Sequence, residues 1–94
     1  MQELIDKIIA FRDSRGWDSS DTPEALVKSL VIEATELLEN FQWGEASYDH
    51  ENVKDELADI LILLLALIHD LHLDPAELID KKIVKIARKY PNKK

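Results

Sequence analysis

Two pairs of acidic residues stand out because each has the i, i+3 spacing that places two side chains on one face of a helix. Glu33 and Glu36 form the first pair, and Glu56 and Asp59 form the second. At about 3.6 residues per turn, the members of such a pair lie within about 60° of each other. Both segments are rich in Leu, Ile and Val. An unpaired carboxylate buried among such residues is strongly destabilising or takes up a proton.

Four carboxylates that meet at one point repel one another and need a positive partner. Lys28 and Lys54 are the basic residues of these segments, and both lie away from the middle. A hard divalent cation fits, and Mg²⁺ or Mn²⁺ suits oxygen ligands better than Zn²⁺, because the chain has no Cys and no well-placed His. Partly exposed acids that share no partner are the alternative, and both interpretations stay open. Glu39 points further round the helix and is expected to be solvated.

Apolar residues at helical spacing, together with capping signals, predict four helices that position these acids. Thr22 before Pro23 and Asp74 before Pro75 each combine a capping side chain with a proline at the first helical position. The expected ranges are about 2–14, 23–43, from near 47–49 to about 71, and 75–90. Short loops make the second and third helices antiparallel. We therefore predict an all-α four-helix bundle formed by residues 1–94 as a single domain.

Length and composition narrow the function classes. A chain of 94 residues leaves much of its surface exposed, so we expect a homodimer or a dimer of dimers. The net charge of −7 argues against binding of a nucleic-acid polymer. The apolar run at residues 60–68 is too short to span a membrane. The absence of Cys and of an N-terminal signal peptide favours a cytoplasmic location.

The charges are distributed unevenly along the chain. Residues 81–94 contain seven of the twelve basic residues and no acid, so all 19 acidic residues lie in residues 1–80. An acidic body with a basic last helix could bind a cation and a polyanion together. A solvated basic tail is the plainer alternative.

The motifs in hand resemble those of a known family. They are the two acid pairs in this order, ELADILILLLAL, KIARKYP near the end, the Trp of FRDSRGW, and ELLENFQW after the first acid. With these motifs, the sequence resembles the MazG-type all-α nucleoside triphosphate pyrophosphohydrolases, and among them the small dCTP-pyrophosphatase-like branch. The resemblance covers about residues 3–91.

The resemblance implies an enzyme that uses Mg²⁺, with Mn²⁺ as a substitute, to hydrolyse nucleoside triphosphates to the monophosphate and pyrophosphate. The expected substrates are dNTPs, non-canonical ones included, in a house-cleaning role. By this reading Glu33, Glu36, Glu56 and Asp59 bind the metal, and Glu33 or Glu36 helps to deprotonate the attacking water. Phosphoryl transfer depends mainly on positioning and charge neutralisation, which such a site supplies.

The resemblance also implies substrate contacts outside the acids. Lys82 and Lys85 would reach the phosphates, and Trp17 and Trp43 would stack on the nucleobase. Stacking of this kind contributes about 1–3 kcal/mol per base. Lysine stems also cover apolar helix stripes routinely, and tryptophans often simply pack in the core. These plainer roles stay open on the residues alone.

Two departures from the family pattern affect specificity. Leu63 stands where dCTP-specific relatives have Tyr, and Ile86 stands where many relatives have Asn. Base preference therefore stays open. Two further alternatives are a phosphoribosyl-ATP pyrophosphohydrolase, which shares the plan of helical acid pairs, and a non-catalytic helical module that uses the acids to bind a metal or a partner.

Overall fold

The part of the chain that the structure describes forms four α-helices. The computed structural model describes residues 1–44 and 48–92. The helices are α1 (Gln2–Ser14), α2 (Pro23–Glu39), α3 (His50–Asp70) and α4 (Pro75–Lys89). Over these two ranges the chain contains no strand, so the all-α prediction is confirmed. None of the helices in the described ranges is long and apolar enough to cross a membrane.

Side-chain caps begin the last three helices. Thr22 Oγ1 accepts a hydrogen bond from the Ala25 N–H at 3.2 Å, and Asp74 Oδ1 accepts one from the Ala76 N–H at 3.0 Å. Asp49 Oδ1 caps α3 through two backbone N–H groups, at 3.1 and 3.2 Å. Each cap satisfies donors that the first turn leaves without an intrahelical partner. The predicted helix starts at Thr22 and Asp74 are confirmed.

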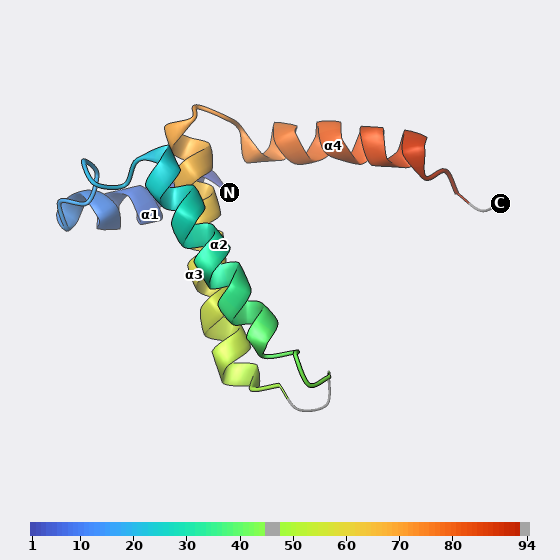
Figure 1. Cartoon of the computed structure of the whole chain (residues 1–94). Helices are drawn as coiled ribbons and strands as arrows, with labels where there is room; N and C mark the ends of the chain where they lie inside the picture. The colour runs from blue at the N-terminus through green and yellow to red at the C-terminus, as the bar shows by residue number, and fades with distance from the viewer. Residues whose placement is uncertain (45–47, 93–94) are drawn as a thin grey trace.

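Helices α2 and α3 form a long antiparallel pair, and α1 packs on α3 (Figure 1). The deepest core residues, all 3% exposed, come from these three helices: Ile5, Leu26, Leu65 and Ala66. Helix α4 leaves the end of α3 and projects to one side of the pair (Figure 1). Among the described residues it makes no extensive contact with the other three helices. One chain alone therefore does not surround α3 with helices.

Large apolar side chains of α3 remain on the surface of the single chain. Leu57, Leu61 and Ile62 are each about half exposed. Helix α4 likewise exposes Ile79 and Ile83 along one face. Several large exposed apolar side chains on one helix are typical of an interaction surface.

Helix α2 ends earlier than the sequence pattern predicts. The expected end was about Trp43, but the helix stops at Glu39. Beyond it the backbone hydrogen bonds change from i→i−4 to i→i−3 spacing. The Asn40 N–H donates to Leu37 O, and the Phe41 N–H donates to Leu38 O. Such tighter turns are common at helix ends. The Asn40 Nδ2 also donates to Asn52 Oδ1 at 2.8 Å, which ties this end of α2 to the start of α3.

Candidate metal and nucleotide site

Three of the four predicted acids converge where α2 packs against α3. Glu33 comes from the middle of α2, and Glu56 and Asp59 come from successive turns of α3. One carboxylate oxygen from each residue lies within 4.8 Å of those from the other two. The i, i+3 spacing places the α3 pair on one face, and the antiparallel packing of α2 and α3 brings Glu33 opposite to it. We refer to these three residues as the carboxylate cluster.

The cluster combines burial with unpaired oxygens. Glu56 is 8% exposed and Glu33 is half-buried, whereas Asp59 is exposed. Within the described chain, the Oε2 atoms of Glu33 and Glu56 are buried and have no hydrogen-bond partner. The close contact with the Glu56 carboxyl, which favours a shared proton, together with burial and repulsion from Glu56 and Asp59, raises the pKa of Glu33. Oxygen-only ligands with unsatisfied buried atoms fit a hard divalent cation such as Mg²⁺.

Glu36 lies beside this cluster rather than in its closest group. It is exposed and lines an open polar hollow of about 460 Å³ together with Glu39, Asn40, Gln42, Asn52 and Glu56. Because Glu56 belongs both to the cluster and to this hollow, Glu36 is a neighbour of the cluster on its solvent side. Glu39 is exposed, as expected for a solvated acid.

A second hollow, largely apolar, adjoins the other side of the cluster. We call it the α1–α3 pocket; it has a volume of about 610 Å³ and is lined by Lys7, Ile8, Phe11, Arg12, Trp17, Asp21, Leu26, Asp59, Ile62, Leu63 and Ala66. Asp59 belongs to both the cluster and the pocket. A ligand in this pocket would therefore extend from an apolar chamber to the carboxylates.

Sequence reasoning identified Trp17, in the loop after α1, but missed the residues of α1 itself that line this pocket. Ile8 and Phe11 follow the ordinary spacing of core residues, so their types carry no sign of a binding role. Trp17 is 48% exposed and packs edge-on against Phe11, with ring centroids 5.8 Å apart. Leu63, which was singled out for specificity, also lines the pocket.

The other predicted contacts lie apart from the cluster within one chain. Trp43 is 83% exposed in the turn after α2. Lys82 and Lys85 line a third hollow, of about 730 Å³, at the turn between α3 and α4. Asp59 and Asp70 are separated by eleven residues of helix, or roughly 17 Å, and α4 starts beyond Asp70 and points away (Figure 1). Lys82 and Lys85 therefore do not approach the carboxylate cluster of their own chain.

Comparison with known proteins agrees with the all-α fold. The model of the MazG-like family matches residues 28–94, which include both acid pairs and the basic helix. The chain therefore belongs to the MazG-like family.

Individual relatives point the same way. A pyrophosphatase from Archaeoglobus fulgidus DSM 4304, known from its crystal structure, is 44% identical with a TM-score of 0.86, covering 98% of this chain and 93% of that one. The dCTP pyrophosphatase 1 of Mus musculus is 31% identical, over 86% of this chain and 53% of the mouse protein. The Homo sapiens protein of the same name is 32% identical with the same coverage. The chain thus spans about half the length of these mammalian relatives.

Proposed function

We propose that this protein hydrolyses nucleoside triphosphates to the monophosphate and pyrophosphate. The carboxylate cluster carries this proposal, because two of its residues, Glu33 and Glu56, have a buried oxygen with no partner in the described chain and the third, Asp59, also lines an adjoining pocket. The names of the relatives support it: one is a pyrophosphatase and the others are dCTP pyrophosphatases.

The cation is proposed to be Mg²⁺, with Mn²⁺ as a substitute. Glu33, Glu56 and Asp59 would hold it, with Glu36 completing the set from the solvent side. When bound, it supplies positive charge that shields the phosphates and lowers the pKa of a water molecule. The cluster lies at the edge of the pocket, where the carboxylates would hold the ion close to the phosphate end of the substrate.

The chain's own residues supply the general base. Glu33 and Glu36 lie one turn apart on α2, and one of them accepts the proton of the water that cleaves the α–β phosphoanhydride. Glu33 is the more buried of the two, and contact with Glu56, burial and the nearby Asp59 raise its pKa. Glu36 is exposed to solvent.

The nucleoside is proposed to enter the α1–α3 pocket and stack on Trp17. The pocket is largely apolar and ends at Asp59, so the base can lie in the chamber while the phosphates reach the carboxylates. Trp43 is the second proposed stacking residue. Its exposure in one chain leaves its ring available to a substrate that extends past the cluster.

A second copy of the chain is proposed to complete the site. Lys82 and Lys85 lie on a helix that projects away from its own carboxylates (Figure 1). The exposed apolar faces of α3 and α4 would be buried between copies, and the basic helix complements an acidic body. A homodimer or homotetramer would thereby bring the lysines of one chain to the phosphates bound by another.

The substrate class follows from the pocket wall. Leu63 gives the pocket an apolar side chain where a Tyr would give a hydroxyl, so recognition of one base edge is weak and several dNTPs, non-canonical ones included, fit. Removal of unwanted dNTPs in the cytoplasm is the role that suits such an enzyme.

Release of pyrophosphate from a panel of nucleotides tests the function. The panel contains dNTPs, NTPs, modified nucleotides and phosphoribosyl-ATP, each with and without Mg²⁺. Mg²⁺-dependent release with the monophosphate as co-product is expected, most strongly for dNTPs. Turnover of phosphoribosyl-ATP alone would favour the rival enzyme. No turnover of any nucleotide, together with measurable Mg²⁺ binding, would leave a non-catalytic module.

A further inference from the structure

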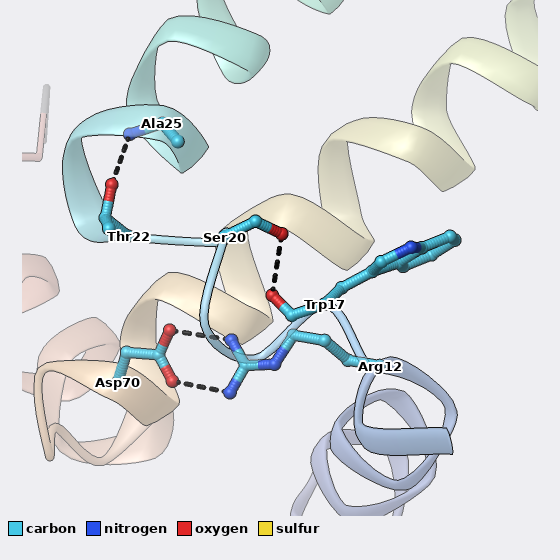
Figure 2. Close-up of polar contacts among 6 residues, drawn as sticks. All are labelled: Arg12, Trp17, Ser20, Thr22, Ala25 and Asp70. Carbon is cyan, nitrogen blue, oxygen red and sulfur yellow. Dashed lines mark hydrogen bonds and ion pairs between the residues drawn. The ribbon is translucent and has the colours of Figure 1, made fainter. Parts of the chain in front are cut away.

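Helix α1 is fastened to α3 at two points on one face. Ile5 is 3% exposed and Arg12 is 9% exposed, and seven residues make about two helical turns. Ile5 is an apolar anchor near the start of α1. Near its end, the Arg12 guanidinium donates two hydrogen bonds to Asp70, from Nη1 to Oδ2 at 2.7 Å and from Nη2 to Oδ1 at 2.9 Å (Figure 2). This bidentate geometry fixes direction as well as distance.

The backbone links Arg12 to the loop that carries Trp17. The Trp17 N–H donates to the Arg12 carbonyl at 3.1 Å. The Trp17 carbonyl in turn accepts from the Ser20 N–H and Oγ, both at 3.1 Å, and from the Asp21 N–H at 2.9 Å. Thr22 follows directly as the cap of α2. Hydrogen bonds therefore connect the backbone of Arg12 to Trp17, and Trp17 to Ser20 and Asp21, directly before the start of α2.

The indole ring of Trp17 points away from the ion pair (Figure 2). Arg12 and Trp17 both line the α1–α3 pocket, whereas Asp70 does not. The packing of α1 on α3 is its only extensive helix contact in the described ranges. The position of its C-terminal end, and so of Trp17, therefore depends on the anchor at Arg12.

We propose that the Arg12–Asp70 ion pair is a positioning pair, which holds Trp17 as a wall of the pocket that receives the nucleoside. The inference rests on the proposed function of the α1–α3 pocket. Asp70 acts through Arg12, and Arg12 acts through the backbone of Trp17. Loss of the pair leaves α1 anchored at Ile5 and frees the indole to move out of the pocket wall.

Steady-state kinetics of Arg12→Met and Asp70→Asn test the proposal against a purely stabilising role. The matched control is Lys28→Met, which removes an exposed ion pair with Glu24 at 3.0 Å. Both variants of the pair should raise KM about tenfold, which is the loss expected when one base-stacking contact is weakened. The value of kcat should change less than about threefold. Arg12→Lys should recover part of the loss, because it keeps one charged donor. The control should keep the KM of the parent.

A double-mutant comparison separates positioning from stability. If Arg12 acts through Trp17, adding Arg12→Met to Trp17→Ala raises KM no further. Additive increases would overturn the proposal, as would a lowered melting temperature in Arg12→Met with unchanged KM. Should Arg12→Met fail to fold, Asp70→Asn and Arg12→Lys give the same comparison.

Tryptophan fluorescence supplies a readout that does not need turnover. In a Trp43→Phe background the emission comes from Trp17 alone, and Arg12→Met should shift it to the red before any nucleotide is added. An unchanged spectrum would overturn the proposal. If the parent enzyme hydrolyses no nucleotide, the proposed function fails instead, and this spectral test still reports on the position of the indole.

Discussion

Glu33 and Glu56 face each other across the α2–α3 pair, each with a buried carboxylate oxygen that has no hydrogen-bond partner in the described part of the chain. Two consecutive helices are thus packed together at a point of charge repulsion. The close approach of the Glu56 carboxyl, with which Glu33 shares a proton when one of the two is neutral, is the largest cause of the raised pKa of Glu33. The fold places this repulsion where a cation relieves it.

The first prediction concerns Glu56→Gln. Removal of one charge should lower Mg²⁺-dependent turnover about 100-fold or more, because metal sites lose about 10–100-fold even when a supporting residue is changed. The metal-free variant should be at least as stable as the parent, since a repulsive contact is gone. Saturating Mg²⁺, expected to stabilise the parent by about 2.7 kcal/mol at a hundred times its Kd, should stabilise the variant far less. Thermal melts with EDTA and with Mg²⁺ measure this.

Glu39→Gln is the matched control for that experiment. Glu39 is exposed on the same helix and lies outside the cluster. It should keep both turnover and the stabilisation by Mg²⁺. If Glu39→Gln and Glu56→Gln lost turnover and stabilisation by Mg²⁺ equally, the overall negative charge of the protein, rather than the carboxylate cluster, would explain the cation dependence.

The sequence predicted much of the fold because its signals are local. The caps at Thr22, Asp49 and Asp74 lie within one turn of the N–H groups that they satisfy. The cluster was predictable as well, since i, i+3 spacing and antiparallel neighbours are enough to bring Glu33 towards Glu56. The end of α2 was not, because Asn40 depends on a contact with Asn52 across the loop.

Contacts between residues far apart in the sequence could not be predicted, because no local pattern encodes them. The pair of Arg12 with Asp70 joins residues 58 positions apart, and neither residue type marks its partner. The direction of α4 depends on the turn after α3, where His72 has a positive φ of 58°. No periodicity in the helix itself encodes that direction, so the distance of Lys82 from the cluster became visible only in the structure.

The two tryptophans should respond differently to nucleotide. Trp17 lines the α1–α3 pocket, whereas Trp43 is 83% exposed in one chain. Trp17→Ala should raise KM by about tenfold or more, given about 1–3 kcal/mol for base stacking. Single-tryptophan variants, Trp17→Phe and Trp43→Phe, allow each emission to be followed during nucleotide titration. If neither emission changes on binding, stacking is excluded for both rings.

Mixing of two inactive variants tests the contribution of α4 from a second copy. Glu56→Gln lacks the cation site, and the double variant Lys82→Ala, Lys85→Ala lacks the phosphate contacts. If lysines reach across copies, a mixed dimer regains one complete site, so equal mixing should restore up to about a quarter of the parent activity when half of the dimers are mixed.

The mixed sample needs proof that subunits have exchanged. Differently tagged variants and co-purification supply it. A mixed dimer without activity would place all the contacts in one chain and contradict the shared site. A monomeric parent enzyme with full activity would contradict it as well.

Leu63→Tyr tests the origin of weak base selection. Leu63 lies one turn beyond Asp59 and lines the same pocket. A hydroxyl in this apolar wall should favour a base that can bond to it, and the resemblance to the dCTP-specific branch implies that dCTP gains. A polar contact of this kind shifts kcat/KM between bases by about tenfold for each 1.4 kcal/mol. Ratios of kcat/KM for the four dNTPs measure it, and an unchanged ranking would remove Leu63 from the specificity argument.

Acid should remove the stabilisation that Asp70 supplies. The side-chain hydrogen bond from Arg12 holds the pKa of Asp70 below its ordinary value. A lowered folded-state pKa stabilises the protein above the unfolded-state value of about 3.9, and the effect is lost as pH falls from there through the folded-state pKa. The side chains of the pair are 11% and 18% exposed, so Asp70→Asn should cost about 2 kcal/mol at neutral pH, less than a fully buried pair.

Below the folded-state pKa of Asp70, both proteins present a neutral group to Arg12, so the difference in unfolding free energy between parent and Asp70→Asn should shrink towards zero. Denaturant unfolding of both proteins across the acid range measures it. Lys81→Met, which removes the exposed pair with Glu77, should instead differ little from the parent at any pH. A gap between parent and Asp70→Asn that stays constant into strong acid would show that packing of the side chain, rather than its charge, makes the contribution.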